Sequence, residues 1–337
     1  MRIWANPSSP HREGRAARAA IEDARARIKR ALGWDGEVIF TSGASEAIAI
    51  ALGRGRGDAR LVSAIEHDAV LRCARDAVRI PVRADATVDP DIFAALVARA
   101  AAPLVAVQHV NSELGVMQDM ATLTALVREK GGLMLCDCAQ SAGKVALPDA
   151  DMIVVSAHKF GGPPGIGALL VREFAMLEPS GGQEFGYRGG TENLPGALGM
   201  AAALEAGAPG PGAAMAPWLE QLLPELLRLG VTVADAGGTR IAASAPRYPG
   251  ITSFAMPGIS SAAQLIRFDL AGFAVSAGSA CSSGTLRPSH VLEAAHVADT
   301  LAGSVVRVSV GWSTTADDIA RFGKAWADIA ARAGNGA

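Results

Sequence analysis

Long apolar runs, signal-peptide features and net charge are all lacking in this sequence of 337 residues. No apolar run approaches the roughly 18 residues that a membrane helix needs, so no membrane association is expected. The N-terminus has no apolar signal region, which indicates a cytoplasmic protein. A formal charge of −2 gives no electrostatic reason to expect nucleic acid as a partner.

Cysteine is also scarce, with four residues whose spacing matches no zinc signature, so we expect no metal site. Cys136 and Cys138 flank Asp137 in an apolar run and are expected to be buried as small hydrophobic side chains. Cys281 differs, because it stands in a segment of serine, alanine and glycine at residues 276–284. Cysteine prefers burial, so this position indicates a reactive thiol, with an incidental surface cysteine as the alternative.

Lysine is rare as well: five lysines stand against 26 arginines. Lys159 follows a predicted buried strand at residues 152–155 and precedes a turn rich in glycine and proline. Arginine carries charge but does not form an imine, so a lysine at this place suggests a Schiff-base lysine. The alternative is an ordinary lysine whose ammonium group extends into solvent from a strand end.

Strands and helices alternate up to residue 171, which predicts an α/β fold with a mostly parallel sheet. Functional groups of such sheets gather at the carboxyl ends of the strands. Five polar residues fall at positions of that kind, namely Ser45, His67, Asn111, Asp137 and Lys159. This coincidence predicts one functional site without the help of any motif.

A segment rich in glycine and proline at residues 206–213 interrupts this pattern. We therefore predict a large domain over residues 1–206 and a smaller α+β domain over residues 207–337. In the smaller domain we expect strands near residues 231–234, 250–255, 273–276 and 305–310, and a final helix at residues 317–331.

Asp137 lies in an apolar strand, and a buried carboxylate needs a cation. The pyridinium nitrogen of pyridoxal 5'-phosphate (PLP) would satisfy it, and such sites pair a Schiff-base lysine with an acid. An arginine partner or a helix cap is the alternative. Gln140 would donate to the ring hydroxyl, and His67 would stack on the ring and move protons. Both residues have an ordinary structural alternative.

Several hydroxyl and imidazole groups suit the cofactor's phosphate, although each alone is an ordinary cap or turn residue: Ser45, Ser156, His158 and Thr191. Arg307 lies in a predicted strand, where its guanidinium fork suits the carboxylate of an amino acid. An intramolecular salt bridge is the alternative for Arg307.

Taken together, these stretches resemble the cysteine desulfurases of the class V aminotransferase family, which have PLP fold type I. The resemblance covers residues 6 to about 313 and rests on several ordered motifs, among them Ser156-x-His-Lys-Phe160 and Ser276-x-Gly-Ser-Ala-Cys281. The other matching stretches are residues 6–11, 40–46, 65–67, 137–140, 181–184, 188–193 and 288–292, with Asn111.

The resemblance implies a PLP-dependent L-cysteine desulfurase that acts as a homodimer. Lys159 holds the cofactor, Asp137 its pyridine nitrogen and Gln140 its ring oxygen, while His67 stacks on the ring. The phosphate is bound by Ser45, Ser156, His158 and, from the neighbouring subunit, Thr191, and Ala44 is a further cofactor-binding residue. Asn111 and Arg307 bind the substrate carboxylate. Cys281 takes the sulfur as a persulfide and alanine leaves, with an acceptor or scaffold protein for iron–sulfur assembly as the implied partner.

The sequence also departs from the family pattern. The family begins with a further N-terminal segment near the active site, and Gly162, Pro164 and Phe185 replace residues usual at their positions. None of these changes removes a principal catalytic group. Two alternatives stay open: a related class V enzyme such as a selenocysteine lyase or aminotransferase, and a catalytically weakened homologue.

Overall fold

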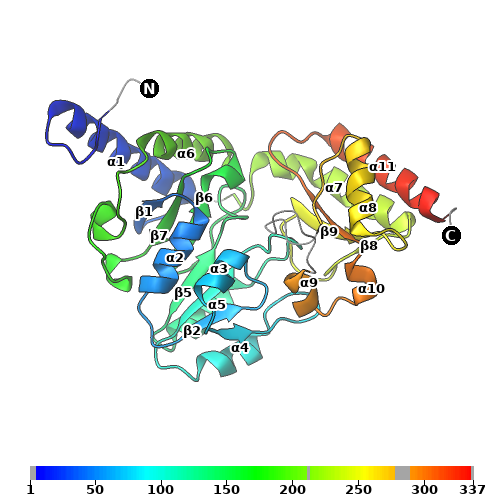
Figure 1. Cartoon of the computed structure of the whole chain (residues 1–337), viewed down its shortest axis with the longest axis horizontal. Helices are drawn as coiled ribbons and strands as arrows, with labels where there is room; N and C mark the ends of the chain where they lie inside the picture. Colours follow the sequence, from blue (N-terminus) through cyan, green and yellow to red (C-terminus); the bar gives the residue numbers. More distant parts are fainter. Residues whose placement is uncertain (1–4, 211–212, 278–288, 335–337) are drawn as a thin grey trace. The chain divides into compact units, whose positions relative to one another are not determined.

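The computed structural model describes residues 5–210, 213–277 and 289–334. The chain divides into two compact units, each assembled from three separate stretches (Figure 1). Unit 1 takes Met1–Ile80, Pro90–His109 and Asp119–Pro217, and unit 2 takes Pro81–Asp89, Val110–Gln118 and Trp218–Ala337. Division into domains at residues 206 and 207 stays a prediction.

Unit 1 is built on a seven-stranded sheet in the order β1-β7-β6-β5-β4-β2-β3. Strand β7 runs antiparallel to both β1 and β6, and the other neighbouring strands pair in parallel, which confirms the predicted α/β fold. Strands β4, β6 and β7 are buried along their whole length, as expected for a sheet covered on both faces. The strands are β1 (Glu37–Thr41), β2 (Arg60–Ser63), β3 (Val78–Ile80), β4 (Leu104–Gln108), β5 (Leu133–Asp137), β6 (Met152–Ser156) and β7 (Gly167–Val171).

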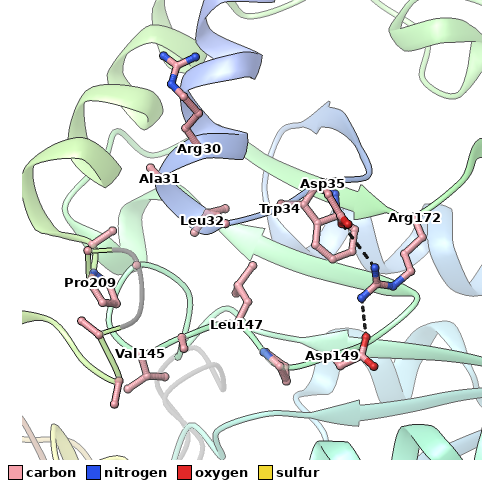
Figure 2. A pocket seen from close by; sticks show the side chains of 18 residues that line it. Arg30, Ala31, Leu32, Trp34, Asp35, Val145, Leu147, Asp149, Arg172 and Pro209 are labelled. Carbon is pink, nitrogen blue, oxygen red and sulfur yellow. Dashed lines mark hydrogen bonds and ion pairs between the residues drawn. The ribbon is translucent and has the colours of Figure 1, made fainter.

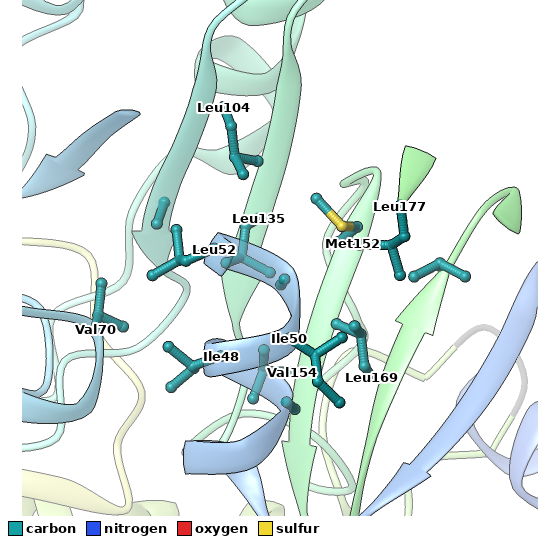
Figure 3. Close-up of a cluster of buried hydrophobic side chains, with 14 of the residues drawn as sticks. Ile48, Ile50, Leu52, Val70, Leu104, Leu135, Met152, Val154, Leu169 and Leu177 are labelled. Carbon is teal, nitrogen blue, oxygen red and sulfur yellow. The ribbon is translucent and has the colours of Figure 1, made fainter. Parts of the chain in front are cut away.

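The helices of unit 1 follow or connect these strands. Helix α1 packs on α6, and α2 lies against β5, β6 and β7. Figure 3 shows Ile48 and Ile50 of α2 packed in a cluster with side chains of these strands, such as Leu135, Val154 and Leu169. The helices are α1 (Arg12–Leu32), α2 (Ala44–Arg54), α3 (Asp68–Cys73), α4 (Pro90–Val97), α5 (Met120–Arg128) and α6 (Leu194–Gly207), with the short helices η1 (Ala157–Phe160), η2 (Phe174–Met176) and η3 (Glu184–Gly186).

Unit 2 contains a three-stranded antiparallel sheet in the order β10-β9-β8. Its core joins Phe254 of β9, Phe268 of α8 and Trp326 of α11, whose aromatic rings pack against one another. This small sheet with helices agrees with the predicted α+β character. Its elements are α7 (Pro217–Asp235), β8 (Thr239–Arg240), β9 (Ile251–Ala255), α8 (Ser261–Leu270), α9 (His290–Ala294), α10 (Asp299–Ala302), β10 (Val305–Ser309) and α11 (Ala316–Gly334).

The predicted strand at residues 231–234 is wrong, because α7 continues through it to Asp235. Leu229 and Val233 are one helical turn apart and are both buried in the same cluster as Trp326. Burial of this helical face outweighs the strand preference of the β-branched residues between them. Near residues 273–276 the structure has a single bridge, between Ser276 and Arg307. Within the described part of the chain, no helix has the length and apolarity needed to cross a membrane.

Candidate active site

The turn between β1 and α2 presents backbone N–H groups at a helix N-terminus. Gly43 caps α2 without a side-chain hydrogen bond, and Ala44 and Ser45 are the first two residues of the helix. The Thr41 hydroxyl donates to the Gly43 carbonyl at 3.0 Å, which braces the turn. Unpaired N–H groups and the helix dipole make such a terminus suitable for an anion. The predicted phosphate residues Ala44 and Ser45 therefore stand at a favourable position.

The end of β6 lies beside this turn. A Cβ atom built on Gly43 would be 3.8 Å from the Ser156 Oγ atom. Ser156 Oγ and His158 Nδ1 are 3.0 Å apart, and Lys159 follows in η1 with an exposed side chain. Burial and the charges of Lys159 and Lys144 lower the pKa of His158. The neutral imidazole is therefore favoured in the protein alone.

Asp137 ends β5, the strand next to β6, and its Oδ1 atom accepts a hydrogen bond from the Ala139 N–H at 2.9 Å. Burial raises the pKa of this carboxyl, while the nearby charges of His67 and Lys159 act in the opposite direction. These three predicted residues are thus close enough to interact electrostatically. Gln140 is partly buried in the turn that follows Asp137.

His67 has a defined orientation because it caps α3. Its Nδ1 atom accepts a hydrogen bond from the Ala69 N–H at 3.1 Å. A neutral His67 therefore carries its proton on Nε2, because Nδ1 is the acceptor in this cap.

Two buried ionisable residues beside this cluster have no role in the sequence predictions. Glu66 is fully buried and accepts a hydrogen bond from the Gln108 N–H at 2.8 Å. The pKa of Glu66 is raised well above its ordinary value, mainly by burial and to a smaller extent by the negative charge of Asp137. Burial and the charge of Lys159 lower the pKa of Lys144 to about 7. The scarcity of lysine that singled out Lys159 was a signal for Lys144 too.

Asn111 and Arg307 lie together in unit 2. The Asn111 Oδ1 atom accepts hydrogen bonds from the N–H groups of Glu113 at 2.9 Å and Leu114 at 2.8 Å. Its oxygen is thereby used in a local turn, which fixes the orientation of the side chain. Arg307 donates to the Ser112 carbonyl at 3.0 Å and to the Ser276 hydroxyl at 3.2 Å. The guanidinium is thus held next to the segment that begins with Asn111.

The remaining predicted residues are Thr191 and Cys281. Thr191 is exposed in the loop between η3 and α6 of unit 1. Cys281 lies outside the described residues.

A hollow of about 760 Å³ in unit 1 is distinct from these groups. Figure 2 shows Arg172 at its edge, paired with Asp35 and Asp149. Of the described residues that line this hollow, none is a predicted site residue.

The sequence and structure were compared with known proteins. The profile of the family described as aminotransferase class-V matches residues 1–322. A cysteine desulfurase IscS of Dictyoglomus turgidum is 33% identical over 94% of this chain and 85% of its own length. A cysteine desulfurase of Klebsiella pneumoniae is 36% identical over 94% of this chain and 83% of its own length.

Among solved structures, the NifS-like protein of Rickettsia africae superposes with a TM-score of 0.81 at 26% identity, over 98% of this chain and 92% of that one. Family profile, relatives and structure agree over nearly the whole length. The chain therefore belongs to the aminotransferase class-V family, in the branch that contains these cysteine desulfurases.

Proposed function

We propose that this protein is a PLP-dependent L-cysteine desulfurase, which converts L-cysteine to L-alanine and carries the sulfur as a persulfide on Cys281. The class V aminotransferases and cysteine desulfurases are PLP-dependent in general. The observation that carries the proposal is that Asp137, at the end of β5, lies within electrostatic reach of both His67, which caps α3, and Lys159, which follows β6.

The residues of unit 1 fit this cofactor on structural grounds. An anion suits the α2 N-terminus, where Gly43 and Ser156 lie side by side. Burial raises the pKa of the Asp137 carboxyl, because burying its anionic form costs free energy. A pyridinium cation beside the carboxylate would offset this cost. PLP supplies an electron sink for the pair of electrons released at the substrate's α-carbon.

Each residue then has a definite task. Lys159 would anchor the cofactor covalently and would move protons at the substrate's α-carbon, while Asp137 would keep the ring nitrogen protonated. His67 would lie against the ring with a proton on Nε2, and Gln140 would donate to the ring oxygen. The phosphate would be held by Ala44, Ser45, Ser156 and His158, with Thr191 contributed by the neighbouring subunit of a homodimer.

The substrate carboxylate binds to Asn111 through its amide N–H₂ group and to Arg307 through its guanidinium. A solved structure described as SspA in complex with cysteine, with a TM-score of 0.75 at 26% identity over 94% of this chain and 93% of that one, supports cysteine as the substrate. The Cys281 thiolate would attack the substrate sulfur and form an S–S bond, while the bond between that sulfur and the substrate β-carbon breaks. The electron pair of the broken bond stays with the carbon skeleton, and the β-carbon takes up a proton, which gives alanine. A protein acceptor in the cytoplasm, such as one serving iron–sulfur assembly, then takes the sulfur.

The direct test is a PLP absorbance spectrum followed by assays of alanine and sulfide with L-cysteine and a thiol reductant. We expect a yellow protein, with formation of alanine and sulfide in equal amounts. Lys159→Ala should lose the visible absorbance of the covalently held cofactor. Cys281→Ala should keep that absorbance and stop alanine formation.

Each outcome has a distinct meaning. Alanine formation that survives Cys281→Ala would remove the thiol from the mechanism and favour a related class V enzyme. A wild-type protein without cofactor absorbance after reconstitution with PLP would contradict the proposal as a whole.

A further inference from the structure

A buried ion pair holds the loop of residues 184–193, which includes η3 and carries Thr191. The Arg25 side chain on α1 is 5% exposed, and that of Glu184 in the loop is fully buried. Arg25 donates to Glu184 through two nitrogens, with Nη1–Oε2 at 2.9 Å and Nη2–Oε1 at 3.2 Å. Glu184 also accepts a hydrogen bond from the Phe40 N–H of β1 at 2.8 Å. One carboxylate thus fixes the loop to both α1 and β1.

The loop adopts a backbone conformation that needs such support. Glu184 and Phe185 have φ angles of 47° and 57°, in the left-handed region that side-chain-bearing residues rarely adopt. The Arg25 guanidinium lies 4.7 Å from the ring centre of Phe40 and 4.8 Å from that of Phe185. These contacts and the ion pair favour the strained backbone over its relaxed alternatives.

A second connection joins the same loop to the phosphate-binding turn. Arg188 Nε donates to Glu46 Oε1 at 3.0 Å, and the other oxygen of Glu46 accepts from the Ser42 N–H at 2.5 Å. Burial opposes ionisation of Glu46, but the hydrogen bonds from Ser42 and Arg188 lower its pKa overall. Glu46 is the neighbour of Ser45, so the loop and the turn are held in a fixed relation.

A third contact lies next to Thr191 itself. Glu192 has a fully buried side chain and pairs with Arg18 of α1, with Nη1–Oε1 at 3.4 Å. Helix α1 therefore holds the loop at both Glu184 and Glu192, on either side of the exposed Thr191 segment.

We propose that Arg25 and Glu184 are positioning residues for the cofactor phosphate: they fix the backbone that presents Thr191. This inference rests on the proposed function, in which Thr191 reaches the phosphate bound by the neighbouring subunit. It predicts a defect that is specific for the phosphate group, whereas a merely structural role would weaken binding of the whole cofactor.

The test is Glu184→Gln, which keeps the side-chain volume and an acceptor for the Phe40 N–H but removes the charge facing Arg25. The affinity of the apoprotein is measured for PLP and for pyridoxal, which lacks the phosphate. We expect PLP affinity to fall about 10- to 100-fold. This is the range found when a residue that orients a metal-binding side chain is replaced, and Glu184 would orient Thr191 in a comparable way. Pyridoxal affinity and the far-UV circular dichroism spectrum should not change.

Two further variants keep the test decisive. If Glu184→Gln alone does not fold, the double variant Arg25→Met with Glu184→Gln removes both buried charges and should show the same selective loss. Arg27→Gln is the matched control, because Arg27 pairs with Glu205 at 2.5 Å between α1 and α6 in an exposed position. It should bind both ligands like the wild type.

A double-mutant cycle with Thr191→Ala tests whether the effect passes through Thr191. Thr191→Ala should lower PLP affinity by itself, and adding Glu184→Gln should lower it little further. Unchanged PLP affinity in Glu184→Gln, equal losses for both ligands, or additive losses would each overturn the inference. A wild-type apoprotein that does not bind PLP would instead overturn the proposed function.

Discussion

Lys144 and Lys159 are both lysines in an arginine-rich chain, but burial gives them different properties. Lys144 is 8% exposed, whereas Lys159 is exposed. The pKa of Lys144 is lowered from an ordinary value of 10.5 to about 7, mainly by burial and to a smaller extent by repulsion from the charge of Lys159. An amine that loses its charge near neutral pH links the stability of the apoprotein to pH.

The sign of this linkage follows from proton binding. Between about pH 7 and pH 10.5 the unfolded chain holds a proton on Lys144 that the folded chain has released. The free energy of unfolding should therefore rise with pH across this window, and the full penalty should apply below about pH 7. The total change is on the order of a few kcal/mol, since one pKa unit corresponds to about 1.4 kcal/mol.

Lys144→Met tests this expectation, because methionine fills a similar volume without a charge. The variant should be more stable than the wild type near pH 7, and the difference should shrink toward pH 10.5. Urea unfolding of the two apoproteins at several pH values gives the comparison, with Lys324→Met on α11 as a control. Parallel stability curves for Lys144→Met and wild type would contradict the assignment.

Single residues also show where prediction from sequence succeeds and where it ends. The positions of Asp137 at the end of β5 and of Lys159 just after β6 were predictable, because polar residues that follow buried strands gather at the carboxyl edge of such a sheet. Their roles stay predictions. The Arg25–Glu184 pair was not, since the partners stand 159 residues apart and only the fold buries them together. Glu66 shares this limit, because its raised pKa arises from packing against β4 and Asp137.

At the level of elements, the turn between β1 and α2, which we propose to bind phosphate, is closely approached by β7. A Cβ atom built on Gly167 would lie 2.6 Å from the Val155 carbonyl oxygen and 2.7 Å from the Gly43 Cα atom. Both neighbours are backbone atoms, so neither yields by rotating a side chain. In the strand register, Gly167 pairs with Thr41 of β1 on one side and with Ser156 of β6 on the other. Gly167 therefore lies between the strand that leads into the turn and the strand that ends beside it.

Gly167→Ala should therefore displace the turn and lower PLP affinity several-fold, with a loss of about 1–3 kcal/mol in stability from overpacking. PLP titration and urea unfolding measure the two effects. Gly53→Ala on α2 is the control, because a Cβ atom there meets nothing within 4 Å. It should bind PLP normally and gain about 0.5–1 kcal/mol as an alanine in a helix. Normal PLP affinity in Gly167→Ala would show that the close approach does not position the turn.

Elements with strong patterns were predictable, and those decided by tertiary packing were not. The alternation of buried strands and helices indicated the parallel sheet, because strands covered on both faces form short apolar runs. The run at residues 231–234 suggested a strand, yet α7 passes through it. Its β-branched residues favour a strand locally, and burial of Val233 beside Trp326 favours the helix more strongly.

On the scale of the whole molecule, unit 2 depends on a short segment from the first half of the chain. Residues 110–118 supply buried Leu114 and Val116, each with no exposed surface. Within unit 2, the Tyr248 N–H donates to the Gly115 carbonyl at 2.8 Å, and the Ser253 hydroxyl donates to the Glu113 carbonyl at 2.7 Å. The change in composition at residues 206–213 could not predict that residues 110–118 belong to unit 2, because this segment lies far from the change in the sequence.

A fragment of residues 218–337 should therefore fail to fold. Without residues 110–118 it leaves buried apolar surface exposed and removes the partners of the Tyr248 N–H and the Ser253 hydroxyl, and each unpaired buried group costs about 1–3 kcal/mol. A second fragment that joins residues 110–118 through a flexible linker to residue 218 restores these contacts and should unfold cooperatively in urea. Far-UV circular dichroism during urea titration distinguishes the two fragments. A cooperative transition in the first fragment would show that β9, β10 and the helices of unit 2 form a stable core on their own, and that residues 110–118 only cover it.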